Sequence, residues 1–519
     1  MANLSLFNTC VPSALPFPTI FGAEFLSIQA SLTQNYTAVA PWVQNPGHWN
    51  ISRSNVSFCN VTLTHTHPGQ SDLITTQIWL PVNPPWNKRL KAVGGGGWVA
   101  GLSAESVAPA NGAIAEGYAV VATDAGGVRN NADVGDWALK SPGNVDINAL
   151  QNFASVGLKD AALAAKSIIK SFFGEAAKFS YFSGCSQGGR QGYMFAQRYP
   201  DIFDGIAAAA PAIYYGASFM STVYPRQVMH EQKYYPSPCE LDAIRNAAIE
   251  ACDGLDGLID GIISRPDSCK FDPYSMVNKT LNCSSSSPGP KTISKGAAAV
   301  AEAAWYGVKD AKGEFLWYTM GHQPLLSGVM STVGPVCSNG TCSVSPIPVW
   351  TDWIRYFLHK NKDVQYGSNV TRRQFEGLLK QGVREYGSII GTDWADLKDF
   401  REAGGKLITY HGTGDSGIPY LNTRHYFNAV KALDHKVTDF YRLFEAPGLG
   451  HCGFGIGGYP GGTFDALVKW VEEGVAPEKL ETVSQFTNKT SIVCPYPKKA
   501  SFKGKKDAVD FGAKDFVCA

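Results

Sequence analysis

The chain has 519 residues, of which 44% are hydrophobic and 17% are charged, and its formal net charge is +1. This composition supplies enough apolar surface for a packed core and excludes wholesale disorder. With 45 Lys and Arg against 44 Asp and Glu and no long basic run, the chain lacks the charge pattern of a nucleic-acid-binding protein. Apolar stretches such as 206–213 are far shorter than the ~20 residues needed to cross a bilayer. We therefore expect a globular protein with no nucleic-acid partner and no membrane span.

The cysteines and the N-glycosylation acceptor sites indicate the cellular compartment in which the protein folds. The 12 Cys form an even set with no Cys-x-x-Cys pair, which favours disulfides over a zinc site. Ten Asn-x-Ser/Thr acceptors accompany them, and this combination is typical of the oxidising secretory route. The first ten residues show no signal-peptide pattern, which fits a mature chain. We expect a secreted, extracellular protein that carries N-glycans.

Two parts of the chain alternate short strands with helices. In the first part, strands are predicted at 90–93, 118–123, 179–183 and 205–209, and a helix at 158–172. In the second part, strands are predicted at 406–410 and 440–444, followed by a helix whose apolar residues have the spacing i, i+3, i+4, i+7: Phe464, Leu467, Val468 and Val471. A β-α-β rhythm of this kind predicts an α/β fold with a mostly parallel sheet.

The rhythm is lost between these two parts. The intervening segment is rich in aromatic residues, Pro, Ser and Cys. We therefore predict one catalytic domain formed by 1–213 and 395–519, with 214–394 as a large inserted lid domain.

The most informative motif follows the third predicted strand. It reads Gly184-x-Ser186-x-Gly188 and runs into a segment compatible with a helix, which is the context of a nucleophile elbow. Glycines are needed at the flanking positions because the chain passes close to itself at such a sharp turn. We predict that Ser186 is an exposed nucleophile.

A serine nucleophile needs a base and a carboxylate that orients the base. His451 lies in a Gly-rich loop after strand 440–444, and Asp415 lies in the loop after strand 406–410. The chain order Ser186, Asp415, His451 is that of an α/β-hydrolase. Asp124, which follows strand 118–123, is the alternative acid.

The oxyanion of an acyl-transfer intermediate needs two N–H donors. The residue after the nucleophile, Gln187, supplies one. The loop of four glycines at 94–97 is the candidate source of the other, through Gly95 or Gly96, although it could be a simple flexible turn. Cys185 precedes Ser186 and Cys452 follows His451; these two are either a bridge between the catalytic loops or two buried thiols.

These segments resemble the Cys-Ser…Asp…His-Cys arrangement of the fungal tannase and feruloyl esterase family, and the similarity extends over nearly the whole chain, to Cys494-Pro-Tyr-Pro and Cys518. The resemblance implies an α/β-hydrolase core with a large lid, a triad of Ser186, Asp415 and His451, and a disulfide between Cys185 and Cys452. It implies no organic cofactor.

The resemblance also implies a structural calcium ion in the lid. Asp253, Asp256 and Asp260 lie within eight residues, and hard carboxylate oxygens suit Ca²⁺, although the spacing does not match an EF-hand and alone would indicate a solvated acidic loop. In the family, carbonyls at positions matching Leu258 and Ile262 are also ligands.

We expect the residues that determine specificity for the acyl group to lie in the lid and not in the core. The sequence offers aromatic side chains that either line a pocket for a flat phenolic acid or form the core of the lid: Trp305, Trp317, Trp350 and Trp353. We expect a serine carboxylic-ester hydrolase for plant phenolic esters or feruloylated saccharides, with a feruloyl esterase favoured slightly over a tannase. The alternative from another class is a binding protein on an inactive hydrolase scaffold.

Overall fold

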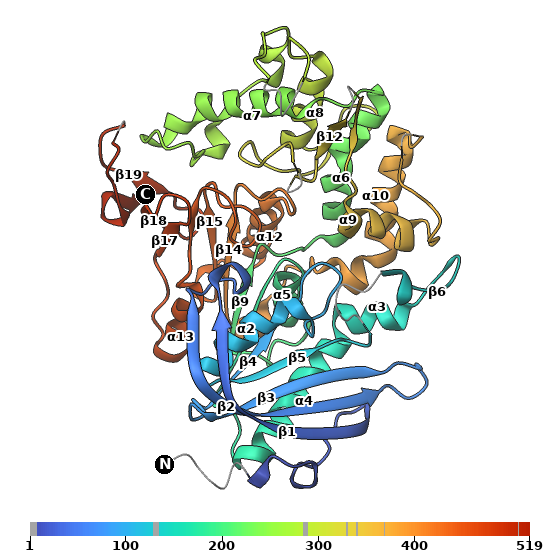
Figure 1. Cartoon of the computed structure of the whole chain (residues 1–519), viewed down its shortest axis with the longest axis vertical. Helices are drawn as coiled ribbons and strands as arrows, with labels where there is room; N and C mark the ends of the chain where they lie inside the picture. The colour runs from blue at the N-terminus through green and yellow to red at the C-terminus, as the bar shows by residue number, and fades with distance from the viewer. Residues whose placement is uncertain are drawn as a thin grey trace.

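The computed structural model describes residues 8–127, 134–283, 289–328, 331–338, 341–367, 369–506 and 508–519. Its centre is a nine-stranded sheet with the order β1-β2-β3-β5-β4-β8-β9-β14-β15 (Figure 1). The strands are β1 (Glu24–Ala40), β2 (Ile51–Thr66), β3 (Ile74–Asn83), β4 (Arg89–Val93), β5 (Ala119–Thr123), β8 (Phe179–Cys185), β9 (Gly205–Ala209), β14 (Lys406–Gly412) and β15 (Tyr441–Ala446). All six predicted strands are confirmed, with bounds that shift by at most two residues.

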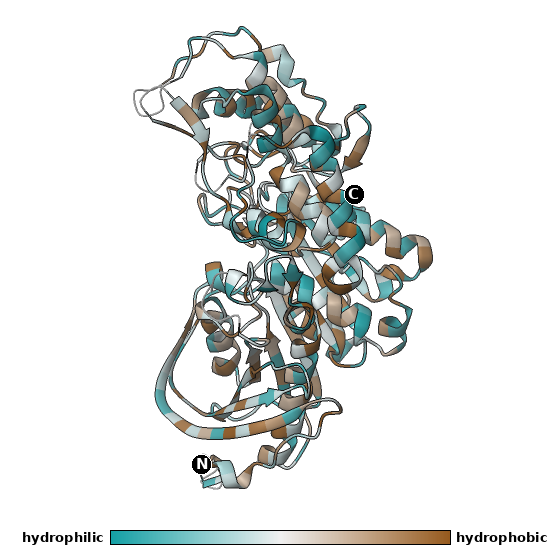
Figure 2. Cartoon of the chain, turned by 90° about the vertical axis from the view of Figure 1, so that its right-hand side faces the viewer, coloured by the Kyte–Doolittle hydropathy of each residue, from teal (hydrophilic) through white to brown (hydrophobic). Residues whose placement is uncertain are grey.

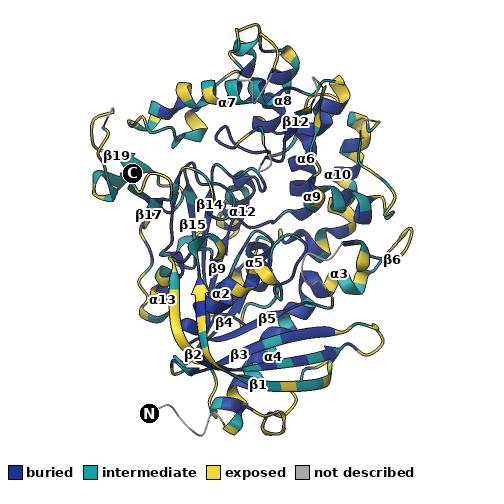
Figure 3. Cartoon of the chain, in the orientation of Figure 1, coloured by how far each residue is buried: buried dark blue, intermediate teal, exposed yellow. Residues whose placement is uncertain are grey.

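The strands from β5 to β15 pair in parallel, whereas β1, β2, β3 and β5 pair antiparallel. The predicted mostly parallel sheet is therefore confirmed. The burial view shows the central strands buried, whereas β1 is mostly exposed or half-buried and β2 is exposed near its start and buried or half-buried along the rest (Figure 3). Along this hairpin hydrophobic and hydrophilic residues alternate, as expected for an edge with one solvated face (Figure 2).

Helices cover both faces of the sheet. One face packs against α2 (Ala104–Ala115) and α13 (Thr463–Glu473), and the other against α4 (Val156–Phe173), α5 (Gln187–Arg198) and α12 (Tyr420–Leu433). On α13 the buried residues are Thr463, Phe464, Leu467 and Trp470. Of the predicted apolar face, Phe464 and Leu467 are thus buried, and Val468 and Val471 are half-buried against the same core. Burying apolar area at roughly 25 cal/mol per Å² on both faces is what stabilises this layered arrangement.

The segment 214–394 lies above the carboxyl ends of the parallel strands (Figure 1). Its described residues form helices and short hairpins, and none of its described strands joins the nine-stranded sheet. The main elements are α6 (Tyr215–Gln232), α7 (Pro238–Cys252), α8 (Lys295–Trp305), α9 (Pro348–Asp352), α10 (Arg372–Tyr386) and the hairpin of β12 (Pro335–Ser338) and β13 (Thr341–Val344). The exact domain boundaries stay a prediction.

All twelve cysteines lie in the described part of the chain and are paired in six disulfides. The pairs are Cys10–Cys59, Cys185–Cys452, Cys239–Cys283, Cys252–Cys269, Cys337–Cys342 and Cys494–Cys518. In the described ranges, no helix is long and apolar enough to span a membrane.

Candidate active site

Ser186 stands at the sharp turn between β8 and α5. Its backbone has φ 63° and ψ −119°, a strained conformation for a residue other than glycine. The turn brings Gly184 against Gly188 so closely that a Cβ on Gly184 would lie 2.7 Å from the carbonyl carbon of Gly188. Only glycine fits there. Ser186 directly follows the carboxyl end of β8, as the motif predicts, and is half-buried where the motif predicts an exposed residue.

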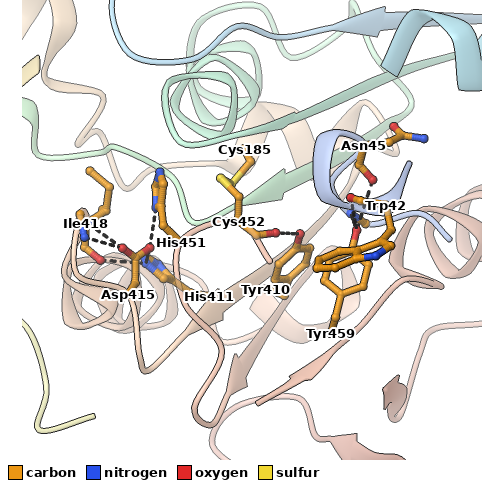
Figure 4. The surroundings of a disulfide bond; sticks show 12 residues. Trp42, Asn45, Cys185, Tyr410, His411, Asp415, Ile418, His451, Cys452 and Tyr459 are labelled. Carbon is orange, nitrogen blue, oxygen red and sulfur yellow. Dashed lines mark hydrogen bonds and ion pairs between the residues drawn. A yellow bond between two sulfur atoms is a disulfide. The ribbon is translucent and has the colours of Figure 1, made fainter. Parts of the chain in front are cut away.

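His451 and Asp415 come together from the loops that follow β15 and β14. Nδ1 of His451 donates a hydrogen bond of 2.7 Å to Oδ2 of Asp415 (Figure 4). The other carboxylate oxygen, Oδ1, accepts from the backbone N–H groups of Gly417 (2.8 Å) and Ile418 (2.9 Å). Because Asp415 is buried and held by these donors, it fixes the orientation of the imidazole and leaves Nε2 for a second partner.

The two groups shift each other's pKa in opposite directions. Burial alone raises the pKa of Asp415, but the charge of His451 and hydrogen bonds from His411 and His451 outweigh burial and hold this pKa well below its usual range. Burial alone lowers the pKa of His451, yet the negative charge of Asp415 and its hydrogen bond raise that pKa above the ordinary 6.5. The pair therefore stabilises an imidazolium, which is what a base that accepts a serine proton requires.

A second histidine also contacts Asp415. Nε2 of His411 lies 3.2 Å from Oδ2 of Asp415 and 3.1 Å from the carbonyl oxygen of Ile418. Both of these atoms only accept, so Nε2 carries the proton. Nδ1 is 2.8 Å from Oγ1 of Thr423, and the ring is fully buried. Sequence analysis missed His411, although its place at the carboxyl end of a parallel strand is a signal that could have revealed it.

The disulfide Cys185–Cys452 joins the residue before Ser186 to the residue after His451. Its Cα atoms are 5.8 Å apart. The hydroxyl group of Tyr410 donates a hydrogen bond of 2.8 Å to the carbonyl oxygen of Cys452 and so helps to fix the disulfide (Figure 4). The pairing that the family resemblance implies is therefore present, and the alternative of two thiols is wrong.

Ser186 and His451 line one pocket of about 500 Å³. The Gly-rich loop 94–97 forms another part of its lining. Gly95 is tied to α5 in both directions, because its N–H donates to Oε1 of Gln191 (3.1 Å) and its carbonyl accepts from the N–H of Gly188 (2.9 Å). The loop is thus a fixed part of the site and more than a flexible turn.

These contacts distinguish the candidate oxyanion donors. The N–H of Gly95 is already used by Gln191, whereas the N–H of Gln187 lies at the first position of α5, where no intrahelical acceptor exists. Gly96 remains as the second candidate donor in the loop.

Asp124, the alternative acid, is not the residue that contacts His451. Its Oδ1 accepts from the backbone N–H groups of Thr75 (2.8 Å) and Gly126 (2.9 Å), so it fixes the loop after β5. The hydrogen bond of His451 goes to Asp415 instead.

The four lid tryptophans are not among the residues that line the pocket. Trp305 and Trp353 are buried in the core of the lid, where Trp353 packs against Tyr215 and Phe357. Trp350 comes nearest to the site: a Cβ on Gly417 would lie 3.4 Å from its Cζ2 and 3.7 Å from Cγ of His451. Trp350 and His451 thus both border Gly417.

In the lid, the three predicted carboxylates lie on a tight turn after α7. Asp253 accepts hydrogen bonds from the N–H groups of Asp260 (3.1 Å) and Gly261 (2.8 Å), and Asp256 from that of Leu258 (3.1 Å). Burial, and then the charge of Asp253, raises the pKa of Asp260 to about 7. Asp253 is buried and Asp256 and Asp260 are half-buried, and hard carboxylate oxygens of this kind fit Ca²⁺ chemically.

Comparisons with known proteins agree with this architecture. Residues 59–519 match the family described as "Tannase and feruloyl esterase". A probable feruloyl esterase of Arthroderma benhamiae is 37% identical over 513 residues, covering 96% of this chain and 93% of that protein. A tannase of Aspergillus oryzae is 29% identical over 505 residues, covering 87% and 84% of the two chains.

Solved structures show the same fold. The tannin acyl hydrolase from Aspergillus niger superposes with a TM-score of 0.86 at 27% identity, covering 99% of this chain and 94% of that one. Feruloyl esterase B from Aspergillus oryzae gives a TM-score of 0.77 at 24% identity, covering 96% and 97%. The predicted α/β-hydrolase fold is therefore confirmed, and the chain belongs to the tannase and feruloyl esterase family of carboxylic ester hydrolases.

Proposed function

We propose that the chain is a feruloyl esterase that releases hydroxycinnamic acids from plant phenolic esters through an acyl-enzyme on Ser186. The observation that carries this proposal is the hydrogen-bonded pair of His451 and Asp415, whose imidazole opens onto the same pocket as Ser186. The chain order Ser186, Asp415, His451 and the contact between His451 and Asp415 support acyl transfer.

The reaction proceeds in two halves. Oγ of Ser186 attacks the ester carbonyl carbon while Nε2 of His451 takes its proton, and the imidazolium then gives that proton to the departing alcohol. Water repeats the sequence on the acyl-enzyme and releases the phenolic acid. Asp415 stays ionised throughout, because its pKa is held low by His451 and His411.

The N–H groups of Gln187 and Gly96 stabilise the oxyanion of each tetrahedral intermediate. Both belong to segments tied to α5, so they are oriented before the substrate binds.

The lining of the pocket supports a substrate with few hydroxyl groups. Apart from Ser183, Ser186 and His451, its polar side chains are Gln44 and Glu105, and apolar residues such as Phe454 form much of the rest. A hydroxycinnamoyl ring presents fewer hydroxyls than a galloyl ring, so it leaves fewer buried polar groups without partners. The resemblance to a probable feruloyl esterase at 37% identity points the same way.

A tannase is the second candidate, because the tannin acyl hydrolase of Aspergillus niger has the same fold over 99% of this chain. Initial rates on methyl ferulate, methyl caffeate, methyl sinapate and methyl gallate separate the two. The proposal requires higher kcat/KM on the cinnamates, and a preference for the gallate would replace it with the tannase. No turnover of any ester, together with no labelling of Ser186 by a fluorophosphonate, would favour the inactive binding scaffold.

We also propose a structural calcium ion in the lid. Carboxylate oxygens of Asp253, Asp256 and Asp260 would hold it, together with the carbonyl oxygens of Leu258 and Ile262. The ion would neutralise the buried acidic turn. It takes no part in the ester chemistry, since these residues are absent from the lining of the pocket that contains Ser186.

We also propose that the protein is secreted. Six disulfides are typical of a protein that folds in an oxidising compartment. Seven sequon asparagines are exposed and accessible for glycosylation: Asn35, Asn50, Asn55, Asn278, Asn282, Asn369 and Asn488. Asn60 is half-buried, and the sequons at Asn3 and Asn339 lie outside the described residues. A shift in mass after treatment with an N-glycosidase tests this part.

A further inference from the structure

A buried cluster of histidines and carboxylates lies between β2 and α4, apart from the lining of the pocket that contains Ser186. His65, His67 and Asp160 each offer a ligand atom, and these atoms all lie within 4.8 Å of one another. Across the residues that the structure describes, this is the one such group of His, Cys, Asp or Glu. All three side chains are almost fully buried.

Local structure explains why the three residues meet. His65 is two residues before His67 at the end of β2, so the two side chains leave the same face of the sheet. Asp160 belongs to α4, which packs on that face against β3 and β5. Strand β2 supplies His65, the turn that follows it supplies His67, and α4 supplies Asp160.

The hydrogen bonds around His67 orient it as a metal ligand would be oriented. Its Nδ1 lies 2.6 Å from Oδ2 of Asp72. Asp72 is itself fixed by Thr66, by the backbone N–H of His67 and by Asn152, all at 2.7–2.9 Å. Nδ1 therefore donates to Asp72, and Nε2 is directed at Oδ2 of Asp160, 2.9 Å away. A carboxylate that holds the distal nitrogen in this way is the usual support of a zinc-binding histidine.

His65 supplies the second, independent observation. Its exposed fraction is zero, yet neither Nδ1 nor Nε2 has a hydrogen-bond partner within the described ranges. Burying polar atoms without partners is costly. A proton shared between His67 and Asp160 would satisfy those two residues and leave both nitrogens of His65 unpaired, whereas a cation held by all three gives one His65 nitrogen a partner.

We propose that His65, His67 and Asp160 bind one Zn²⁺ ion. Two imidazole nitrogens and one carboxylate oxygen are ligands that zinc accepts, with bonds of about 2.0–2.2 Å. Such bonds separate neighbouring ligand atoms by about 3.3 Å, so the contact between His67 and Asp160 opens by a few tenths of an ångström when the ion enters. The ion crosslinks β2 to α4 and has a structural role.

The test measures metal content on the full chain, produced without a histidine tag and dialysed against metal-free buffer. Elemental analysis is expected to find about one zinc per chain in the wild type and less than about 0.1 in His65→Phe, which fills the space beside Phe25 without a ligand. His230→Ala removes a buried histidine from the lid and is the matched control; its zinc content is expected to equal that of the wild type.

A second measurement on the wild type does not depend on the folding of a variant. After dipicolinate strips the metal, Zn²⁺ added alone is expected to raise Tm, and Co²⁺ is expected to give the visible absorption of a four-coordinate site. His65→Phe is expected to lose both responses. Wild-type protein that takes up no zinc, or a His65→Phe variant that keeps a full equivalent, would overturn the proposal.

Discussion

Cys185 is bonded to Cys452, and through this disulfide the residue before Ser186 is fixed to the residue after His451. The two cysteines are 267 positions apart in the chain, and the nucleophile and the base follow strands β8 and β15, which lie on either side of β9 and β14 in the sheet. Without the disulfide, the two catalytic loops would be held relative to each other only by the four strands β8, β9, β14 and β15. The disulfide therefore fixes the distance between these loops directly.

Removal of this bridge is expected to harm catalysis more than folding. Closing so long a loop contributes about 5 kcal/mol in chain-entropy models, and five other disulfides remain in the double variant Cys185→Ala/Cys452→Ala. A misplacement of about 1 Å costs on the order of a hundredfold in rate. Circular dichroism and single-turnover kinetics at a temperature where both proteins are folded check this expectation. The double variant Cys494→Ala/Cys518→Ala, which removes a bridge far from the triad in sequence, is the control and is expected to acylate normally.

His411 is expected to act as a positioning residue for Asp415. The variant His411→Phe keeps the ring but loses the hydrogen bonds to Asp415, Ile418 and Thr423. Loss of one charge-assisted bond corresponds to about 1.5–3 kcal/mol, so kcat is expected to fall about 10- to 100-fold with KM nearly unchanged. Steady-state kinetics measure the two parameters separately. An increase in KM with normal kcat would show that His411 acts on substrate binding instead.

The acid limb of the rate profile follows from the pKa of His451. Nε2 must be unprotonated to accept the Ser186 proton, and the negative charge of Asp415 raises the pKa of the ring above 6.5. As pH falls through that raised pKa, kcat/KM is expected to fall, with an apparent midpoint above 6.5. In Asp415→Asn the raising charge is gone, so the limb moves to lower pH while the rate drops about 10³- to 10⁴-fold. An acid limb that stays in place in Asp415→Asn would identify another base.

Removal of calcium is expected to destabilise the lid. Without a cation, the carboxylates of Asp253, Asp256 and Asp260 repel one another in a half-buried turn. In the His65→Phe variant, which lacks the proposed zinc site, EGTA should therefore lower Tm by about 5 °C and Ca²⁺ should restore it. The variant Asp260→Asn relieves part of the repulsion and removes a ligand. It is therefore expected to be more stable than the wild type in EGTA and to respond less to Ca²⁺; an unchanged response in differential scanning fluorimetry would contradict the site.

The central strands were predictable because parallel strands buried on both faces are continuous apolar runs. The strands β1 to β3 were not predicted, although the alternation of hydrophobic and polar residues along the outer hairpin is a strand signal that could have revealed β1 and β2. Ser186, Asp415 and His451 follow strand ends, so order and spacing revealed them. Three other contacts depend on side-chain packing that no local sequence pattern encodes. They are the hydrogen bond from the Gly95 N–H to Gln191, the contact of His411 with Asp415 and the contact of His67 with Asp160.

The role of Ser186 is tested most directly by single-turnover hydrolysis of methyl ferulate by Ser186→Ala, with Ser183→Ala as the matched control from the same strand and the same pocket. Loss of the nucleophile leaves only binding and oxyanion effects, so the account predicts at least about a thousandfold loss in Ser186→Ala, no covalent feruloyl adduct by intact mass, and a rate within about tenfold of wild type in Ser183→Ala. A folded Ser186→Ala protein that turns over the ester at the wild-type rate would contradict it.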